Sequence, residues 1–254
     1  MVAFDLSGKK IIVTGASSGI GRQVAIECSN LGATVLLLGR DKQRLMESQN
    51  LMKNSYLHEI FQLDYSAESI EWDEVAQQIQ LKIGVVDGIV HCAGITSTLP
   101  FNSINDRKLD EIFKINVNAP LLLTKVLSKK GILNQEGASI IFIASVMSTV
   151  GEVAKTLYSA TKGALVGAVK SMALEFARKN IRVNAISPGV ILTPMVQNGV
   201  YAQDPENLDR VTKMHPLGLG SPTDVANACI YLLSDGGRWV TGTNLILDGG
   251  YSAH

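Results

Sequence analysis

The stretch KKIIVTGASSGIGRQVAIECSNLG, from Lys9 to Gly32, decides the fold of this 254-residue chain. Its opening segment, KKIIVTG, is a short apolar run rich in β-branched side chains, which predicts a buried strand. A glycine-rich turn follows at once, and residues 20–31 then have the pattern of a helix. A strand, a glycine-rich turn and a helix in this order are typical of the unit that opens a dinucleotide-binding parallel sheet.

Three glycines in this turn are spaced as G-x-x-x-G-x-G, and each would have its own task. Gly15 permits the tight turn, Gly19 removes a side chain where the backbone approaches a pyrophosphate, and Gly21 lets the helix pack closely on the strand. The diphosphate would rest on the amide groups at the start of the helix, where the dipole favours anions. The alternative is a tight connection without a ligand, so the interpretation depends on the rest of the chain.

The remaining chain alternates short apolar runs with helical patterns, which predicts a parallel sheet covered on both faces. We therefore expect the α/β class, with a single Rossmann-like, doubly wound, seven-stranded parallel sheet in one domain over residues 1–254. The strands are expected at residues 9–15, 33–39, 58–64, 85–94, 138–145, 181–189 and 243–250, and the helices at residues 20–31, 41–53, 68–81, 105–130, 156–180 and 221–234.

One region lacks a clear pattern. Residues 193–220 are polar, contain Pro194, Pro205 and Pro216, and show little periodicity. A long irregular stretch inside a compact domain is usually a functional loop. We expect this region to be a lid over the substrate.

The composition argues against several classes of partner. Hydrophobic residues make up 46% of the chain, enough for a sizeable core, and the formal net charge of zero gives no footprint for nucleic acid or an anionic membrane. The cysteines and histidines have no metal-ligand spacing, and no apolar run approaches the ~18 residues of a membrane span. The first residues lack the charge order of a secretory signal. We expect a cytoplasmic protein without a metal, a nucleic-acid partner or a membrane partner.

The end of the second predicted strand, LLLGRD, bears on the choice of dinucleotide. Sites that prefer an unphosphorylated ribose usually place an acid here, and Gly39 occupies that place. Arg40 follows, and a guanidinium can bind a phosphate with two donors at once. Arg40 could instead be a solvated surface residue, and Asp41 could pair with the ribose. The sequence favours NADP(H) over NAD(H).

The segment LYSATKGAL sets Tyr158 and Lys162 four residues apart, on one face of the helix predicted at residues 156–180. A carbonyl that receives a hydride must also receive a proton, but tyrosine has a reference pKa of ~10. A cation one helical turn away favours the phenolate and should lower that pKa. The pair therefore predicts an acid/base group.

Further motifs are spread over the chain: HCAG at 91–94, INVNAP around Asn116, IASVMSTVG around Ser145, SPGVILTP at 187–194 and DGG at 248–250. With these motifs and the glycine spacing, the chain resembles the short-chain dehydrogenase/reductase family over nearly its whole length. It is similar throughout to 3-oxoacyl-carrier-protein reductases. HCAG stands where the family usually has NNAG, and we interpret His91 as a structural hydrogen-bonding residue.

The resemblance implies a catalytic set of Asn116, Ser145, Tyr158 and Lys162. Tyr158 would be the acid/base, and Lys162 would also hydrogen-bond the nicotinamide ribose. Ser145 would hold the substrate oxygen, and Asn116 would interrupt its helix and help to anchor a water chain to Lys162. Taken singly, each has an ordinary alternative as a surface side chain, a strand-end hydroxyl or a helix cap.

The resemblance also implies which residues contact the cofactor. Asp64 would face the adenine amino group, and a turn or cap aspartate is an equal alternative. The full expected set is Gly15, Ser17, Ser18, Gly19, Ile20, Gly21, Arg40, Asp64, Ala93, Gly94, Tyr158, Lys162, Pro188, Gly189, Ile191 and Thr193.

The expected activity is hydride transfer between NADP(H) and a carbonyl or secondary alcohol, with a 3-oxoacyl-carrier-protein as the first candidate. The sequence has no distinctive basic cluster for an acidic carrier protein, so a sugar, steroid or small ketone stays open. A non-catalytic dinucleotide sensor or scaffold on the same fold also stays open. The small-molecule substrate would lie among mostly apolar side chains, namely Thr96, Val146, Met147, Val190, Met195 and Tyr201.

The helix predicted at residues 156–180 carries small residues at helical spacing, Gly163 and Gly167 among them, beside an apolar stripe. One face would pack on the sheet, and the other would meet its twin across a two-fold axis. We therefore expect a homo-oligomer, and the resemblance adds that such dimers commonly pair into tetramers. The alternative is that the small residues only make room for the cofactor and for packing on the sheet.

Overall fold

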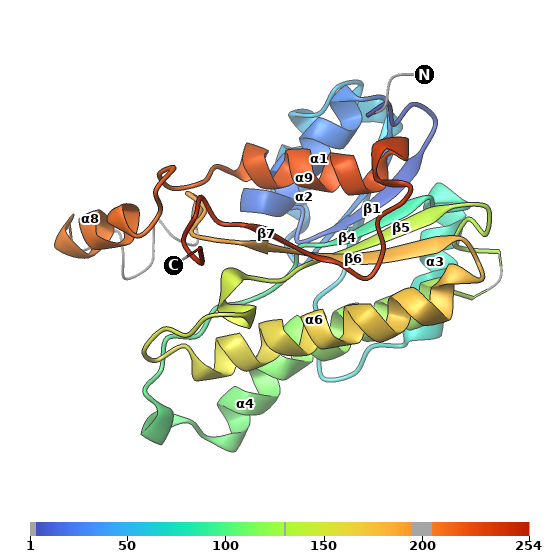
Figure 1. Ribbon diagram of the computed structural model, residues 1–254. Helices are drawn as coiled ribbons and strands as arrows, with labels where there is room; N and C mark the ends of the chain where they lie inside the picture. The colour runs from blue at the N-terminus through green and yellow to red at the C-terminus, as the bar shows by residue number, and fades with distance from the viewer. Residues whose placement is uncertain (1–3, 130, 195–204, 254) are drawn as a thin grey trace.

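The computed structural model describes residues 4–129, 131–194 and 205–253. Within them the chain forms a seven-stranded parallel sheet in the order β3-β2-β1-β4-β5-β6-β7. The strand order therefore runs outward in two directions from the neighbouring strands β1 and β4, which confirms the predicted doubly wound architecture (Figure 1). The strands are β1 (Lys10–Thr14), β2 (Thr34–Gly39), β3 (Glu59–Gln62), β4 (Gly88–His91), β5 (Ala138–Ile143), β6 (Ile181–Pro188) and β7 (Asn244–Leu247).

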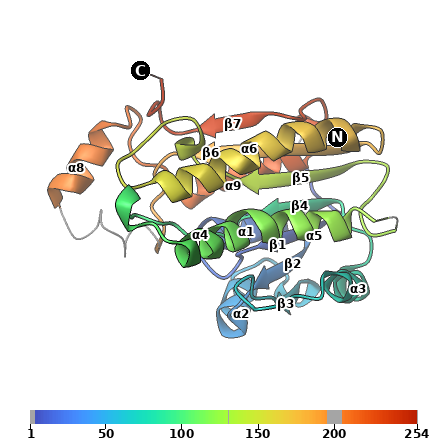
Figure 2. The same ribbon diagram turned by 90° about the horizontal axis from the view of Figure 1, so that it is seen from below.

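Helices cover both faces of the sheet, as Figures 1 and 2 show from two directions. One face carries α1 (Gly19–Asn30), α2 (Lys42–Asn50) and α9 (Pro222–Leu233); the other carries α3 (Trp72–Ile83), α4 (Asp106–Phe113), α5 (Ala119–Leu127) and α6 (Thr156–Ala177). Successive strand residues serve opposite layers: Ile11 and Val13 pack with α1 and α9, whereas Ile12 packs with α3 and α5. Because helices cover both faces of the sheet, the strand residues on either face are buried, which explains why the strands are continuous apolar runs. None of the described helices is long and apolar enough to cross a membrane.

The helix predicted at residues 105–130 is interrupted. It runs as α4, then as a π-helical turn over Lys114–Asn118, and then as α5. Asn116 lies in the π-helical turn and is almost fully buried, in agreement with the interruption expected at this residue. Such turns are often found at functional sites, because they move one side chain out of the helical register.

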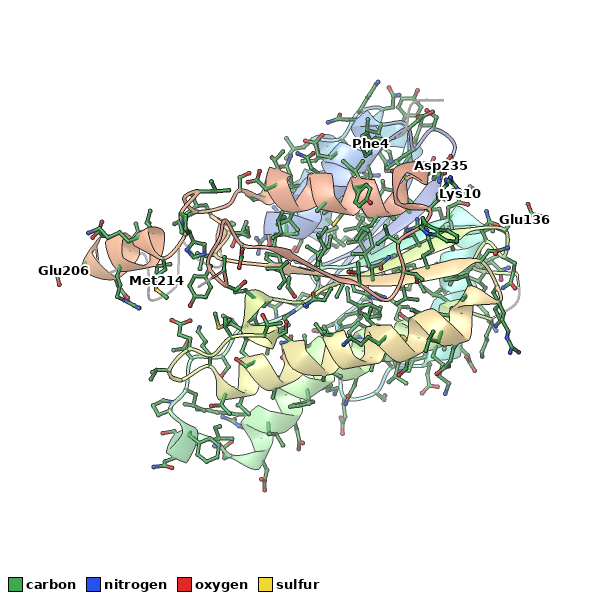
Figure 3. The ribbon with its side chains drawn as sticks, in the orientation of Figure 1. Phe4, Lys10, Glu136, Glu206, Met214 and Asp235 are labelled. Carbon is green, nitrogen blue, oxygen red and sulfur yellow. The ribbon has the colours of Figure 1, made fainter. Side chains whose placement is uncertain are left out.

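The region that was expected to be a lid contains a helix that the sequence analysis did not predict. Helix α8 spans Pro205–Lys213, where residues 193–220 were expected to be irregular. Three features favour a helix here. The segment begins with a proline and has the acidic residue Glu206 in its first turn, and Lys213 forms an ion pair with Asp209 at 2.5 Å. The helix projects from the body of the molecule, and Glu206 and Met214 mark its two ends in Figure 3.

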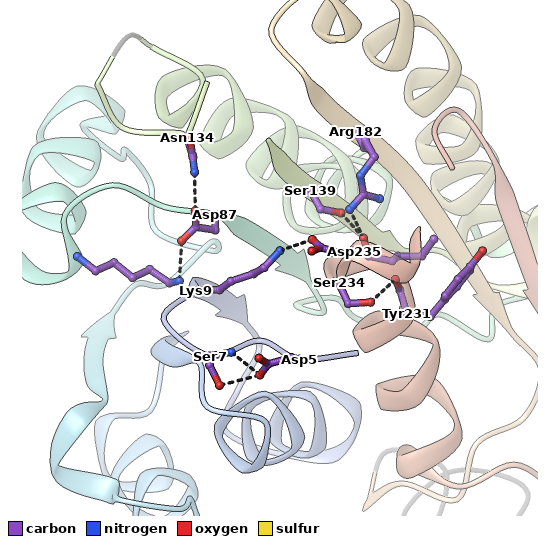
Figure 4. A network of polar contacts seen from close by, with 12 residues as sticks. Asp5, Ser7, Lys9, Asp87, Asn134, Ser139, Arg182, Tyr231, Ser234 and Asp235 are labelled. Atoms are coloured by element: carbon purple, nitrogen blue, oxygen red, sulfur yellow. Dashed lines mark hydrogen bonds and ion pairs between the residues drawn. The ribbon is translucent and has the colours of Figure 1, made fainter. Parts of the chain in front are cut away.

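Polar contacts tie together the amino ends of the strands (Figure 4). Asp87, just before β4, accepts from the backbone N–H of Lys10 at 2.8 Å and from Asn134 at 2.7 Å. Arg182 of β6 donates to the backbone oxygen of Leu232 at 2.6 Å, and Ser139 of β5 donates to the same oxygen. Lys9 pairs with Asp235 at 3.3 Å. This end of the sheet is closed, which leaves the carboxyl ends for a ligand.

Candidate active site

Two adjoining cavities lie at the carboxyl ends of the strands, where the winding of the sheet reverses. Their volumes are about 390 Å³ and 580 Å³. Five residues line both, so the two form one continuous cleft: Ile20, Cys92, Gly94, Ile95 and Thr193. A crevice at this point is the usual ligand site of a doubly wound sheet.

The glycine-rich turn forms the floor of the smaller cavity. Gly15 has a positive φ of 65°, and a Cβ on it would lie 2.8 Å from the backbone of Ala93. A Cβ on Gly21 would lie 2.4 Å from the carbonyl oxygen of Gly15, which is the close helix–strand packing predicted for it. Gly19 also has a positive φ, 53°, and faces the side chain of Thr193. No side chain therefore covers the backbone at these three glycines, and Ser17, Ser18 and Ile20 complete the wall of the cavity.

Two arginines line the outer end of this cavity. Arg40 lies where the sequence predicted it, and Arg44, which the sequence analysis missed, lies four residues further in the first turn of α2. Asp41 is the N-cap of α2 and accepts from the backbone N–H of Arg44 at 3.1 Å. Its carboxylate is thus engaged at a helix start, while Gly39 offers no carboxylate at all. The outer end of the cavity is therefore lined by two guanidinium groups, which can bind an anion.

Asp64 lines the same cavity in a turn. Its carboxylate accepts from the backbone N–H of Ser66 at 2.8 Å and from the Ser66 hydroxyl at 2.7 Å. These hydrogen bonds, with the nearby charge of Arg40, hold the pKa of the Asp64 carboxyl below its ordinary value. The turn alternative is therefore present in the structure, and the adenine contact stays a prediction.

Ser145, Tyr158 and Lys162 all line the larger cavity. Ser145, just after β5, accepts from the backbone N–H of Met147 at 3.2 Å. Lys162 Nζ donates to the backbone oxygen of Ile143 at 2.8 Å and lies 5.6 Å from the centroid of the Tyr158 ring. The structure thus brings these three predicted residues together. The expected neighbours Thr96, Val146, Met147 and Val190 line this cavity too.

Burial dominates the titration of this group. It raises the pKa of the Tyr158 phenol, and a hydrogen bond with Ser145 opposes part of the rise. It lowers the pKa of the Lys162 ammonium to about 8. The pKa of Tyr158 is thus raised and not lowered as expected from Lys162, because desolvation of the phenolate is the largest effect on it. Tyr158 is accordingly protonated at neutral pH and can donate a proton.

Asn116 has bonding partners that the sequence did not indicate. Its Oδ1 accepts from the backbone N–H of Ile95 at 2.8 Å. Its Nδ2 donates to the Ile95 carbonyl at 2.9 Å and to the Thr161 hydroxyl at 3.1 Å. Asn116 therefore fixes α6 relative to the segment after β4, which also carries Ala93 and Gly94. The water chain to Lys162 stays a prediction.

The segment after β6 forms the other side of the cleft. Pro188, Gly189, Ile191 and Thr193 line the larger cavity, in the order in which the chain leaves the sheet. His215, which the sequence analysis missed, accepts from the backbone N–H of Val190 at 3.2 Å and connects this segment to the end of α8. The predicted contacts Met195 and Tyr201 lie outside the described residues.

The larger cavity is more polar than the sequence analysis predicted. The additional residues that line it include Thr98, Glu152, Lys155, Asn207 and Arg210. A usable signal existed for one of them. Lys155 directly precedes the helix that carries Tyr158 and Lys162 and lies three residues before Tyr158.

His91 is a buried structural residue, as expected. Its ring stacks on Phe142 with centroids 4.6 Å apart, and its Nε2 lies 2.9 Å from the Thr124 hydroxyl. Its Nδ1 has no hydrogen-bond partner among the residues that the structure describes. Burial lowers the pKa of this imidazole to about 3, so it is neutral near pH 7. The cavities do not include His91 among their lining residues.

Comparisons with known proteins agree with this geometry. A family model described as enoyl-(acyl carrier protein) reductase matches residues 15–252. A 3-oxoacyl-[acyl-carrier-protein] reductase from Rickettsia felis is 33% identical over 247 residues, which cover 97% of this chain and 98% of that protein. A human (3R)-3-hydroxyacyl-CoA dehydrogenase is 32% identical over 250 residues and 94% of each chain.

A solved structure shares the whole fold. It is that of a protein from Agrobacterium tumefaciens provisionally assigned as a 2-deoxy-D-gluconate 3-dehydrogenase, with bound NADP. The two chains match over their full lengths with a TM-score of 0.89 and 26% sequence identity. The named relatives and this structure all point to an oxidoreductase that acts on C=O or CH–OH groups.

The buried imidazole of His91 predicts an acid-sensitive stability. Below pH 6.5 the unfolded chain binds a proton on His91 that the folded chain excludes until about pH 3, so stability falls as the solution is acidified. Between pH 7 and pH 5, urea unfolding should show a loss about 2 kcal/mol smaller in His91→Asn than in the wild type. Thr124→Val keeps the imidazole and should keep the wild-type pH dependence. Equal losses in His91→Asn and the wild type would contradict this account.

Proposed function

The chain belongs to the short-chain dehydrogenase/reductase family, and from this premise we propose that it is an NADP(H)-dependent oxidoreductase with Tyr158 as its acid/base. The reaction interconverts a carbonyl compound and the corresponding secondary alcohol. The single observation that carries the proposal is the convergence of Ser145, Tyr158 and Lys162 on one cavity, beside the bare glycine turn. These three groups come from a strand end and from one helix face, and only the fold places them together.

In the proposed mechanism, the substrate oxygen lies between the hydroxyls of Ser145 and Tyr158. The Ser145 hydroxyl donates a hydrogen bond to that oxygen and stabilises its developing negative charge. The nicotinamide, when bound, supplies the hydride in reduction and accepts it in oxidation. Tyr158 donates its proton to the oxygen during reduction and takes it back during oxidation. The ammonium of Lys162 stabilises the phenolate that Tyr158 leaves behind.

NADP(H) is the proposed cofactor. The fit rests on the glycine cradle, in which a side chain at Gly15 or Gly21 would collide with backbone, and on the two arginines of the outer end. Arg40 and Arg44 would hold the 2′-phosphate of the ribose, and Asp64 would lie toward the adenine. Ala93, Gly94, Gly189 and Thr193 would lie along the ribose and nicotinamide. The bound NADP in the Agrobacterium tumefaciens structure supports the same choice.

A 3-oxoacyl or 3-hydroxyacyl compound is the proposed substrate class, because the Rickettsia felis and human relatives are named for such compounds. The apolar wall of Val146, Met147 and Val190 fits an acyl chain. A sugar derivative is the second candidate, favoured by the gluconate dehydrogenase assignment of the solved structure. A non-catalytic sensor is disfavoured, because such a protein has no need of Tyr158 beside Ser145 and Lys162.

A homo-oligomer is proposed through the outer face of α6. A Cβ on Gly163 or Gly167 would meet nothing within 4 Å, so these glycines are not required by packing within one chain. Leu174, further along the same helix, is 80% exposed. An apolar, bare helix face of this kind favours a second copy across a two-fold axis over the alternative of tight packing on the sheet. The molar mass from light scattering would also distinguish a dimer from a tetramer.

Tyr158→Phe tests the chemistry. The variant keeps the ring but loses the proton, so kcat should fall by about 10²–10⁴ while NADPH binding, followed by calorimetry, is retained. Tyr56→Phe, at a surface tyrosine 81% exposed, should leave the activity unchanged. A Tyr158→Phe enzyme within about tenfold of the wild type would assign the proton transfer to another residue. A wild type that binds NADPH without turning over any member of a carbonyl panel would favour the sensor.

Arg40→Ala tests the cofactor. Removal of a guanidinium that binds a phosphate should lower kcat/KM for NADPH by the equivalent of about 1.5–3 kcal/mol and leave the value for NADH nearly unchanged. Arg107→Ala, on the exposed side of α4, is the matched control. An equal loss with both dinucleotides, or a wild-type preference for NADH, would argue against the phosphate contact.

Gly167→Arg tests the assembly. An arginine on this bare face should break the oligomer into monomers, as light scattering at micromolar concentration would show, because the two helices could no longer approach closely. Circular dichroism should be unchanged, since the added side chain meets no neighbour in its own chain. Gln78→Arg on the exposed side of α3 should not alter the assembly. A wild type that is already monomeric would exclude this face as a stable interface.

A further inference from the structure

A buried histidine lies behind the wall of the cleft and has no part in the mechanism above. His215 is 3% exposed and follows the last residue of α8 by two positions. Its Nδ1 lies 2.7 Å from the backbone oxygen of Val211, and its Nε2 lies 3.2 Å from the backbone nitrogen of Val190. A carbonyl oxygen can only accept and a backbone N–H can only donate, so Nδ1 carries the ring hydrogen and Nε2 is the acceptor. The two bonds therefore engage both nitrogens of a neutral imidazole.

The wall in front of this imidazole depends on a side chain at one point. Gly189 and Val190 line the larger cavity, and Thr193 lines both cavities. The backbone oxygen of Val190 accepts from the N–H of Gly220 at 3.1 Å, which is a contact between two backbone groups. The N–H of Val190, in contrast, donates to the side chain of His215. Loss of that acceptor would leave a partly buried N–H unsatisfied in the wall, which is costly.

The DGG motif at residues 248–250 supports the imidazole from the other side. The ring of Tyr251, which follows the motif, packs on His215 with centroids 4.8 Å apart. Gly249 has a positive φ of 59°, and a Cβ on it would lie 3.0 Å from the backbone oxygen of Gly218, in the turn after His215. The motif thus packs closely on the turn that carries the imidazole. This contact gives DGG a role that the proposed mechanism does not use.

Gly189 shows how closely the imidazole approaches the wall. A Cβ on Gly189 would lie 2.9 Å from Nε2 of His215 and 3.0 Å from Cα of Asp248. These separations leave no room for a side chain, so packing behind the wall is sufficient to require glycine here. Because the imidazole and the wall are in contact, a shift of His215 would also shift Gly189 and Val190.

We propose that His215 is a positioning residue for the nicotinamide side of the cleft: its Nε2 fixes the N–H of Val190 and with it the wall of residues 189–193. The inference rests on the proposed function, because that function places the ribose and nicotinamide along Gly189 and Thr193. His215 is not among the lining residues of either cavity, so it acts through Val190 and not by contact with a ligand. In the competing account, His215 only stabilises the packing of the C-terminal segment on α8.

Two probes that differ in the nicotinamide half separate these accounts. NADPH would fill the whole cofactor site, whereas adenosine 2′,5′-bisphosphate would fill only the end formed by the glycine turn and Arg40. His215→Phe keeps a ring beside Tyr251 but removes the acceptor of the Val190 N–H. The dissociation constant of NADPH, measured by calorimetry, should therefore rise by about tenfold or more. That of adenosine 2′,5′-bisphosphate should stay nearly unchanged, whereas a merely structural role would weaken both or neither.

Two further variants at the same position test the acceptor itself. The amide of His215→Gln can reach the place of Nε2 and accept from Val190, so this variant should retain most of the NADPH affinity. The amide of His215→Asn can replace only the bond to Val211, so this variant should bind NADPH as weakly as His215→Phe. His215→Asn therefore provides the test if the phenylalanine variant does not fold.

His58 is a matched control with the same kind of bonds. Its Nδ1 accepts from the backbone N–H of Val35 at 3.1 Å, and its Nε2 lies 2.9 Å from the backbone oxygen of Lys53. It is 4% exposed and is not among the lining residues of either cavity. His58→Phe should lower the stability to urea, because it too leaves a buried backbone N–H unsatisfied, but the affinity for NADPH should be unchanged.

The outcomes distinguish this role from the proposed function. An NADPH affinity that neither His215→Phe nor His215→Asn changes would overturn the positioning role and leave the oxidoreductase intact. Equal losses for NADPH and adenosine 2′,5′-bisphosphate would also overturn it, in favour of the structural account. A selective loss for NADPH, in a protein that turns over no carbonyl compound, would support the positioning role and overturn only the proposed catalysis. A wild type that binds neither probe would overturn both.

Discussion

The close approach of two backbone segments at the reversal of the sheet determines what this molecule can bind. The turn after β1 and the segment after β4 touch because Gly15 has no side chain, and an added Cβ would lie 2.8 Å from the backbone of Ala93. Gly21 repeats the constraint one turn later against Gly15 itself. A dinucleotide needs bare backbone amides at the start of a helix, and this contact produces them. The neighbouring residues Cys92, Gly94 and Ile95 line both cavities, so the two cavities meet beside this contact.

The chemical end is held in place from the other face of the sheet. Asn116, displaced inward by the π-helical turn, bonds to both backbone groups of Ile95 and to Thr161 of α6. Helix α6 carries Tyr158 and Lys162, so this carboxamide helps to set their position relative to the segment after β4. The surrounding burial then adjusts the chemistry: it keeps the phenol of Tyr158 protonated and lowers the pKa of the Lys162 ammonium toward neutrality. In the proposed mechanism, rigid positioning and desolvation together prepare Tyr158 to donate a proton to the substrate oxygen.

The residue just before α6 adds a second lysine to the larger cavity. Lys155 lies three residues before Tyr158 and lines the cavity together with Lys162 and Arg210. The backbone N–H of Leu99 donates to the backbone oxygen of Ala154, and this bond joins two loops beside Lys155. Cationic side chains therefore reach the cavity from α6, from the loop before it and from α8.

The local sequence alone determined much of the fold and the position of the cleft. The apolar runs and helical patterns predicted every strand and a parallel, doubly wound sheet, because strands that are buried on both faces are continuous apolar runs. The glycine spacing and the Tyr158–Lys162 pair predicted the two ends of the cleft, because their meaning is contained in a few adjacent residues. Tertiary structure decided the rest. The partners of Asn116, the dominance of burial over charge at Tyr158 and the entry of Lys155 and Arg210 into the cavity all depend on segments distant in sequence. Burial and long-range hydrogen bonds arise only when those segments pack together, so local patterns in the sequence do not predict them.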